Sequence, residues 1–430
     1  MITPAGHYST PQRSKQYLCA SRGNLRIVEV KASGLSDNRN RQVFREMATR
    51  QRQGLVVFIA ALFVRAVAAV ITTFTTLNPD STADARGFVR VASIIAGNIM
   101  QGQLTTPGAG YIYDLWGSFL APFWLLPGPS GLYARLGNAL LAAFAIYNVY
   151  LIARTYHSHQ AGVLAALPMI FYPSFVAVHS TVLREAIVLF GITTATRLLV
   201  VSSRYYSRRL TYPLAGVTLY IAYIMRADNV VICVAAIAAA LAAHAIERTS
   251  NPSRSVSIGT ALSVAGFVLA LPLVRDGIKR LARIRDMRAF GRTVYLPDVV
   301  PRTVLELLAF SWIGAAYFLY APFPWMIETV PDLLVSVEGL VNIGFTIAAV
   351  WGVHWLAQRE FPITVGLLIG LIVAVTLYGV GTANYGTGMR HRQMFLWVIF
   401  LFGAIGLSER IVFRTPAMQH RENTRPSESD

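Results

Sequence analysis

One apolar run organises this chain: Gly54-Leu-Val-Val-Phe-Ile-Ala-Ala-Leu-Phe-Val-Arg-Ala-Val-Ala-Ala-Val-Ile-Thr-Thr-Phe-Thr-Thr-Leu77. It has the length that an α-helix needs to cross a bilayer. Two carboxylates, Asp80 and Asp84, follow it directly. Pro79 favours the end of the helix at this point, because proline has no N–H to continue the hydrogen-bond ladder. The stretch predicts a membrane span that places two acidic side chains where it leaves the bilayer.

Apolar runs of similar length recur along the chain. Its 430 residues are 54% hydrophobic and 14% charged, with a mean hydropathy of +0.49, whereas a soluble protein carries roughly a quarter charged residues. We therefore expect an all-α polytopic membrane protein with about 10–11 transmembrane helices. The expected spans are 54–77, 132–154, 161–178, 186–202, 211–225, 230–246, 256–274, 333–355, 361–380 and 393–407, while 304–320 either crosses or lies in the interface.

The net charge of +17 indicates which ends of the spans face the cytoplasm. Residues 1–53 hold ten Lys/Arg and three acids, and positive charge beside a span marks the cytoplasmic side. We expect a basic cytoplasmic tail over 1–53, a transmembrane domain over 54–410 and a C-terminal tail over 411–430. The expected location is the inner (cytoplasmic) membrane with the N-terminus inside. No sequence motif indicates a nucleic-acid partner.

Two loops on the opposite side are predicted to hold structure of their own. In the loop 78–131, the apolar positions Phe88, Val91, Ala92 and Ile95 recur at helical spacing, which predicts a short helix along the membrane surface. Its part 114–129 is apolar but broken by prolines, which favours a re-entrant or interfacial element. The loop 275–303 holds eight Lys/Arg and three Asp. It is either a basic amphipathic helix on the membrane, or the sign of one miscounted span.

The acids and arginines beyond the spans are the candidates for chemistry. A carboxylate can take the proton from an incoming hydroxyl, and arginines can stabilise charge on a departing phosphate. The alternative is that these acids and arginines form ion pairs or helix caps that only stabilise the fold. The candidate catalytic residues are Asp84, Asp80 and Glu185, and the candidate lipid-phosphate or substrate-binding residues are Arg86, Arg184, Arg226, Asp228, Arg390, His391 and Arg392.

Bound cofactors are not expected. The chain has no Walker sequence, and its two cysteines, Cys19 and Cys233, show no metal-ligand spacing. A divalent metal ion held between Asp80 and Asp84 is the one metal site that the sequence leaves open.

At these residues the chain resembles the GT-C class of membrane glycosyltransferases, which use polyprenyl-phosphate-linked sugars, or related polysaccharide-assembly membrane proteins. The pattern Asp84-x-x-x-Phe88-x-x-x-Ala92 is similar to the loop helix of that class, and the turn Leu-Arg-Glu185 sits where the class often places a second acid. The resemblance implies an inverting transferase with a lipid-linked sugar donor and a glycan or lipid acceptor. The chain lacks the adjacent Asp-Glu pair of the oligosaccharyltransferase and protein-mannosyltransferase subgroups.

Two other functions stay open at the level of sequence. The first is a polysaccharide polymerase or ligase that joins glycans linked to lipid pyrophosphate, which the basic segment 275–292 favours. The second is a transporter or flippase without enzymatic activity. In that case Arg65 and Glu306, which stand inside apolar runs, would line the pathway.

Overall fold

The computed structural model describes residues 16–21, 24–29, 36–75, 83–204, 208–248 and 276–410. Three predictions fall outside these residues: the acid Asp80, the span 256–274 and the tail 411–430. The described residues are almost entirely helical. The first helices are α1 (Ser36–Phe74), α2 (Ala83–Met100), α3 (Tyr111–Leu120), the 3₁₀ turn η2 (Ala121–Leu125), α4 (Ser130–Tyr156), α5 (His159–Phe171), α6 (Pro173–His179), α7 (Glu185–Arg204) and α8 (Arg208–Met225).

The second half of the chain continues the same pattern. A helix covers 276–288. The other elements are α9 (Asn229–Arg248), α11 (Val304–Tyr320), the 3₁₀ turn η3 (Pro324–Met326), α12 (Val330–Ala357), α13 (Phe361–Gly381), α14 (Tyr385–Arg392) and α15 (Leu396–Arg410).

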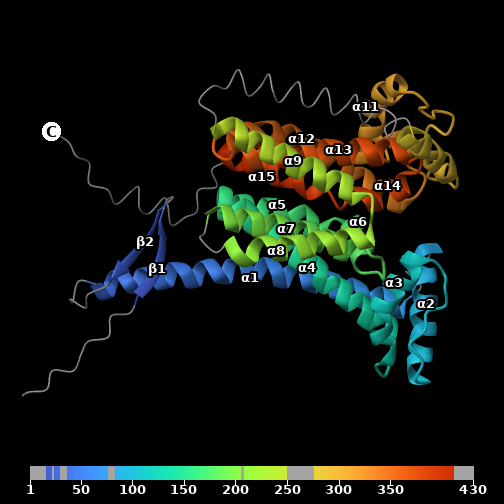
Figure 1. The fold of residues 1–430 in the computed structure, drawn as a ribbon, viewed down its shortest axis with the longest axis horizontal. Coiled ribbons are helices and arrows are strands. Elements are labelled where there is room, and N and C mark those ends of the chain that lie inside the picture. The colour runs from blue at the N-terminus through green and yellow to red at the C-terminus, as the bar shows by residue number, and fades with distance from the viewer. Residues whose placement is uncertain are drawn as a thin grey trace, which may run out of the picture.

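The long helices lie side by side in two layers (Figure 1). One layer holds α1, α4, α5, α7 and α8, and the other holds α9, α12, α13 and α15. Within the layers, α12 packs on α15, α13 on α9, and α7 on α8, while α5 packs on α15 and joins the two layers. The short connection between α8 and α9 passes from one layer to the other.

Five helices among the described residues are long and apolar enough to cross a membrane: Gln51–Phe74 of α1, α4, α9, α12 and α13. Two bent pairs, α5 with α6 and α14 with α15, raise this number to seven if each pair is one span. Helices α8, from Leu210, and α11 are apolar but shorter. The chain therefore has the helices of a multi-pass membrane protein, and the expected number of about ten spans stays a prediction.

The N-terminal part is more regular than the tail expected over 1–53. Strands β1 (Gln16–Ser21) and β2 (Asn24–Glu29) pair antiparallel in a hairpin. Helix α1 begins at Ser36, far before the apolar run at Gly54. The described part of the chain is thus helical with one small hairpin.

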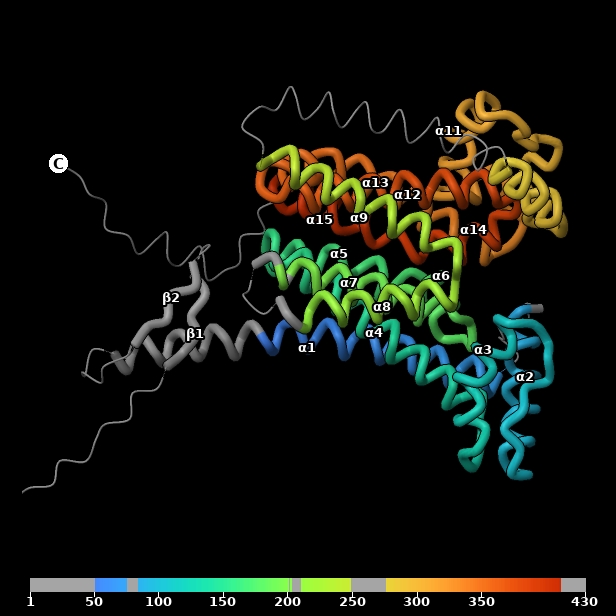
Figure 2. The backbone as a smooth tube through the Cα atoms, in the orientation of Figure 1, coloured from blue at the N-terminus to red at the C-terminus, as the bar shows by residue number. Residues whose placement is uncertain are grey.

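Helix α2 lies across the ends of the long helices (Figures 1 and 2). The helical spacing predicted at its apolar positions is confirmed, but these side chains face protein. Phe88, Val91, Ala92 and Ile95 are all buried, and α3 and η2 pack over them. The proline-broken part of the loop forms the short elements α3 and η2 rather than a span. We call this end of the bundle, which also carries α14 and the helix 276–288, the site end.

The packing of α12 on α15 depends on glycine. A Cβ atom on Gly352 would lie 1.8 Å from the carbonyl oxygen of Phe402, so the two backbones touch. We expect Gly352→Ala to separate these helices and to destabilise the purified protein by about 1–3 kcal/mol. Gly344 on the same helix is the control, because nothing lies within 4 Å of its Cβ position. Gly344→Ala should leave the thermal melting temperature in detergent unchanged or raise it, and equal melting of the two variants would contradict this packing.

Candidate functional site

The centre of the site end is a chain of ion pairs between elements far apart in sequence. Arg390 of α14 donates from Nη1 and Nη2 to Oδ2 of Asp84 on α2, both at 3.2 Å. Its Nη2 also donates to Oε1 of Glu185 at 2.9 Å. Arg226, just after α8, donates from Nη2 to the same Glu185 oxygen at 3.1 Å. The structure thus brings together four residues that the sequence indicated separately.

Glu185 is held in place by the turn that precedes α7. The backbone carbonyls of this turn accept from side chains of two other helices: Trp116 Nε1 donates to Val182 O at 2.7 Å, and Asn138 Nδ2 donates to Leu183 O at 2.8 Å. A buried turn needs such donors, because its carbonyls lie outside any helical ladder. The glutamate then stands in the first turn of α7, where a helix favours negative charge.

Asp84 is the acid of the cluster that meets solvent. Its side chain is 45% exposed, whereas that of Glu185 is fully buried. Oδ1 of Asp84 accepts from the hydroxyl of Tyr113 at 3.0 Å. Burial and the neighbouring Asp84 carboxylate raise the pKa of the Tyr113 hydroxyl, so it stays a donor at neutral pH. Asp84 is therefore a carboxylate held in a fixed position at the solvent-exposed edge of the cluster.

Two further arginines lie near this group. Arg184 donates to Met225 O at 2.7 Å and interacts electrostatically with Arg226 and Asp84. Arg288, at the end of the helix 276–288, interacts with Arg226, Asp228 and Arg390. Burial and the nearby Arg226 lower the pKa of Arg288. Set against Asp84, Glu185 and Asp228, the four arginines (184, 226, 288 and 390) leave one positive charge in excess, which favours an anionic ligand.

The basic loop 275–303 fastens α14 to the bundle. The predicted amphipathic helix is present over 276–288, but its Ile278 and Arg285 are buried against protein. Arg285 donates to Thr382 O at 2.6 Å and to Val299 O at 2.7 Å. Asn384, the residue before α14, caps that helix and bonds to Phe290 O at 3.0 Å. These contacts fix the start of the helix that carries Arg390.

The remaining sequence candidates lie in different surroundings. Arg86 is exposed on α2, and Asp228 is exposed between α8 and α9. The His391 ring is buried, with its centroid 5.0 Å from that of Tyr378. Arg392 points away from Asp84, since it donates to Leu319 O at 3.1 Å and to Ala321 O at 2.7 Å.

Three contributors were missed by sequence reasoning: Tyr113, Arg288 and Tyr378. The Tyr378 hydroxyl donates to Asn229 Oδ1 at 3.4 Å and interacts electrostatically with Arg226. Arg288 belongs to a basic stretch that the sequence singled out only as a whole. Nothing in the sequence marked Tyr113 or Tyr378 as a site residue, because aromatic residues are common throughout an apolar chain.

No metal centre is found in the described part of the chain, where no three His, Cys, Asp or Glu side chains gather closely enough to hold an ion. At Asp84 a guanidinium already occupies the position that a cation would take. The pairing of Asp84 with Asp80 lies outside the described residues.

Comparison with known proteins gives no family for this chain. No protein-family model matches it, and no curated protein is significantly similar to it in sequence. Its function must therefore be inferred from the geometry of the site.

Proposed function

We propose that this protein is an inverting membrane glycosyltransferase of the GT-C type, which moves a sugar from a polyprenyl-phosphate donor to a hydroxyl acceptor. The proposal places the reaction on the non-cytoplasmic face of the cell membrane, in the assembly of cell-envelope glycans. One observation supports it above the others: the half-exposed carboxylate of Asp84 lies at the solvent-exposed edge of a cluster that contains four arginines.

In the proposed reaction, the acceptor hydroxyl oxygen attacks the anomeric carbon of the sugar from the face opposite the phosphate. Asp84 takes the hydroxyl proton as the new C–O bond forms. The bond between the anomeric carbon and the phosphate oxygen breaks, and the electron pair leaves with the phosphate. Arg390 and its neighbours stabilise the charge that develops there. Glu185 is a positioning residue, because it holds Arg390 and Arg226 through the same carboxylate oxygen.

The polymerase or ligase alternative keeps one supporting observation. Arg288 adds a fourth cation to the cluster beside Arg184, Arg226 and Arg390, three of the five arginines that the sequence indicated. A pyrophosphate carries more negative charge than a single phosphate.

The transporter alternative is less well supported. It needs Arg65 and Glu306 along one pathway. Arg65 is buried and donates to Ala61 O and Met169 O, whereas Glu306 is an exposed acid in the first turn of α11 and accepts from Arg302 N at 2.9 Å.

The test uses the purified protein in proteoliposomes, with polyprenyl phosphate that carries a radiolabelled sugar and a mixture of glycan and lipid acceptors. The expected result is label in an acceptor and free polyprenyl phosphate as the second product. Label that moves across the bilayer while still attached to its lipid would instead support the flippase. Lipid-pyrophosphate-linked glycans, supplied in a parallel reaction, test for the polymerase or ligase.

A further inference from the structure

A groove between α1 and α4 lies near the end of the bundle that is opposite the site end. Helix α1 runs from that end towards α2 (Figure 2). The groove has a volume of ≈ 600 Å³, within the range of about 300–1,000 Å³ that is usual for ligand-binding pockets. We call it the α1–α4 groove. Among the described residues, it is lined by Gln51, Arg52, Leu55 and Phe58 of α1 and by Phe144 and Tyr147 of α4.

The lining of the groove changes from polar to apolar along the helices. Arg52 stands two residues before the apolar run that begins at Gly54. The hydroxyl of Tyr147 lies at the level of Gly54, because a Cβ atom on that glycine would be 3.4 Å from it. Phe58 lies deeper, about 9 Å beyond Arg52 at the helical rise. This order of guanidinium, phenol and phenyl groups matches a membrane interface, where charged headgroups give way to hydrocarbon.

The aromatic wall of the groove is already assembled in the bundle. The ring centroid of Phe58 lies 4.8 Å from that of Phe144 and 6.1 Å from that of Tyr147. The guanidinium of Arg197 on α7 lies 5.7 Å from the centre of the Tyr147 ring. Leu55 is 53% exposed and Phe144 is 41% exposed, so the groove is open along its side. A lipid can therefore enter it from the bilayer without a rearrangement of the helices.

The charge at this end of α1 favours an anionic headgroup. Arg52 is exposed, and none of the lining residues that the structure describes is acidic. The first part of the same helix, residues 36–53, holds five arginines and two acids. Clusters of basic residues beside a membrane-spanning helix attract anionic phospholipids.

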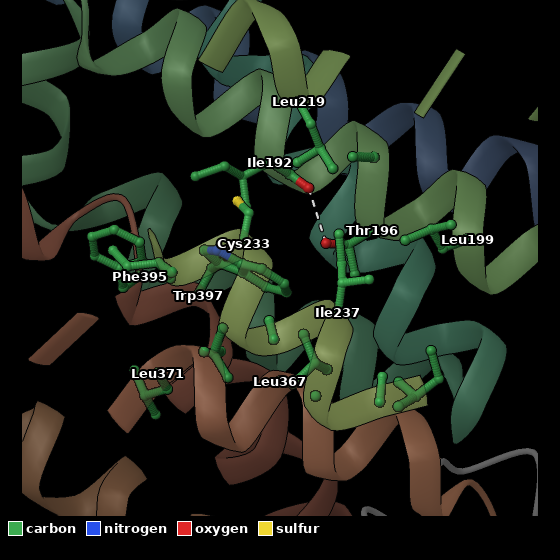
Figure 3. A pocket seen from close by; sticks show the side chains of 18 residues that line it. Ile192, Thr196, Leu199, Leu219, Cys233, Ile237, Leu367, Leu371, Phe395 and Trp397 are labelled. Atoms are coloured by element: carbon green, nitrogen blue, oxygen red, sulfur yellow. Dashed lines mark hydrogen bonds between the residues drawn. The ribbon is translucent and has the colours of Figure 1, made fainter. Parts of the chain in front are cut away.

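A different cavity, between the two layers of the bundle, has no such charge (Figure 3). It measures ≈ 130 Å³, and no charged side chain is found among its lining residues in the described chain. A phosphate placed there would lose its water without gaining an ion pair. Of these two cavities, only the α1–α4 groove combines a cation with an apolar wall.

We propose that the α1–α4 groove binds an anionic phospholipid, with the phosphate at Arg52 and the acyl chains against Phe58 and Phe144. The lipid belongs to the leaflet on the side where α1 enters the bundle, whereas the transfer reaction is proposed at the site end. This inference is therefore independent of the proposed function. The bound lipid fills the space between α1 and α4 where the bundle is open.

A single cysteine in the groove reports its occupancy. Leu55→Cys is placed in a protein without native thiols (Cys19→Ser, Cys233→Ala), because Cys233 lines the cavity between the layers and could react as well. Its rate of reaction with a small apolar maleimide is measured in detergent. Phosphatidylglycerol at ten times its Kd should slow the reaction about tenfold, since only the unoccupied protein reacts. The control is Val56→Cys, which is exposed but does not line the groove, and its rate should not change.

The contact with the headgroup is tested with a matched pair of arginine variants. Arg52→Gln should weaken the binding of phosphatidylglycerol about fivefold, the effect of one basic residue near a membrane surface. It should leave the binding of phosphatidylcholine unchanged. Arg248→Gln removes the same charge from an exposed position at the same end of the bundle, but on α9 in the other layer. This variant should leave both Kd values unchanged.

Phosphatidylglycerol should protect the reporter at concentrations at least fivefold lower than phosphatidylcholine with the same acyl chains. Equal protection by the two lipids would overturn the proposal, because the groove would then only contact bulk lipid. Equal effects of the two arginine variants would also overturn it, since general surface charge would explain the preference. Tighter binding of polyprenyl phosphate than of phosphatidylglycerol would assign the groove to the sugar donor instead. Each measurement is of binding, so its outcome is separate from that of the transfer assay.

Discussion

The Asp84→Asn variant is expected to transfer sugar about 10²–10⁴-fold more slowly than the wild type, the range seen when a general base is removed. Asparagine keeps the shape of the side chain and one acceptor oxygen for Tyr113 or Arg390, but it cannot take a proton. The side chain is 45% exposed, and exposed ion pairs contribute about 0–1 kcal/mol. The variant should therefore melt near the wild-type temperature, so that lost activity reports chemistry rather than unfolding.

The control for this prediction is Asp114→Asn. Asp114 stands in the first turn of α3 and accepts from Ala109 N at 3.2 Å, so its substitution removes the same charge from the same loop without touching Arg390. It should retain activity. The loss at Asp84 should appear in kcat with little change in the donor KM. A wild-type rate for Asp84→Asn, alone and together with Asp80→Asn, would refute the assignment of the base.

Much of the architecture was predictable because it follows from the hydrophobicity of single runs. Apolar stretches of sufficient length had to be helices, and the acids and arginines just beyond them had to lie at helix ends. That argument led to Asp84, Glu185, Arg226 and Arg390 before any contact between them was known. The hairpin β1–β2 and the start of α1 at Ser36 were not predicted, since charged residues before a span carry little hydrophobic pattern.

The pairing within the site was not predictable, because it depends on directions around helices and on contacts between distant elements. Arg390 and Arg392 are two positions apart on α14 and hence about 200° apart around its axis. They therefore face opposite ways, and only Arg390 reaches Asp84. The helical spacing of apolar residues correctly predicted α2. It did not predict that α3 and η2 cover these residues, because periodicity alone cannot distinguish a membrane surface from packed protein.

Glu185→Ala is expected to lower the free energy of unfolding by about 3–5 kcal/mol, the usual effect of breaking a buried ion pair. Glu185 is fully buried and accepts from both Arg226 and Arg390. Without it, Arg226, which is only 6% exposed, remains as a buried cation without its carboxylate. The measurement is thermal melting in detergent, compared with Glu306→Ala. Both acids stand in the first turn of a helix, but Glu306 is exposed, so its loss should cost about 1 kcal/mol or less.

A double variant separates the charge effect from the loss of packing. If the unpaired Arg226 causes the damage, then Glu185→Ala together with Arg226→Ala should be more stable than Glu185→Ala alone, because residues in one network are coupled. Arg390 keeps Asp84 as its partner in both proteins. Melting of Glu185→Ala at the wild-type temperature would mean that water reaches both arginines. The cluster would then be an open charged surface, and the preorganised phosphate site on which the proposed reaction depends would not exist.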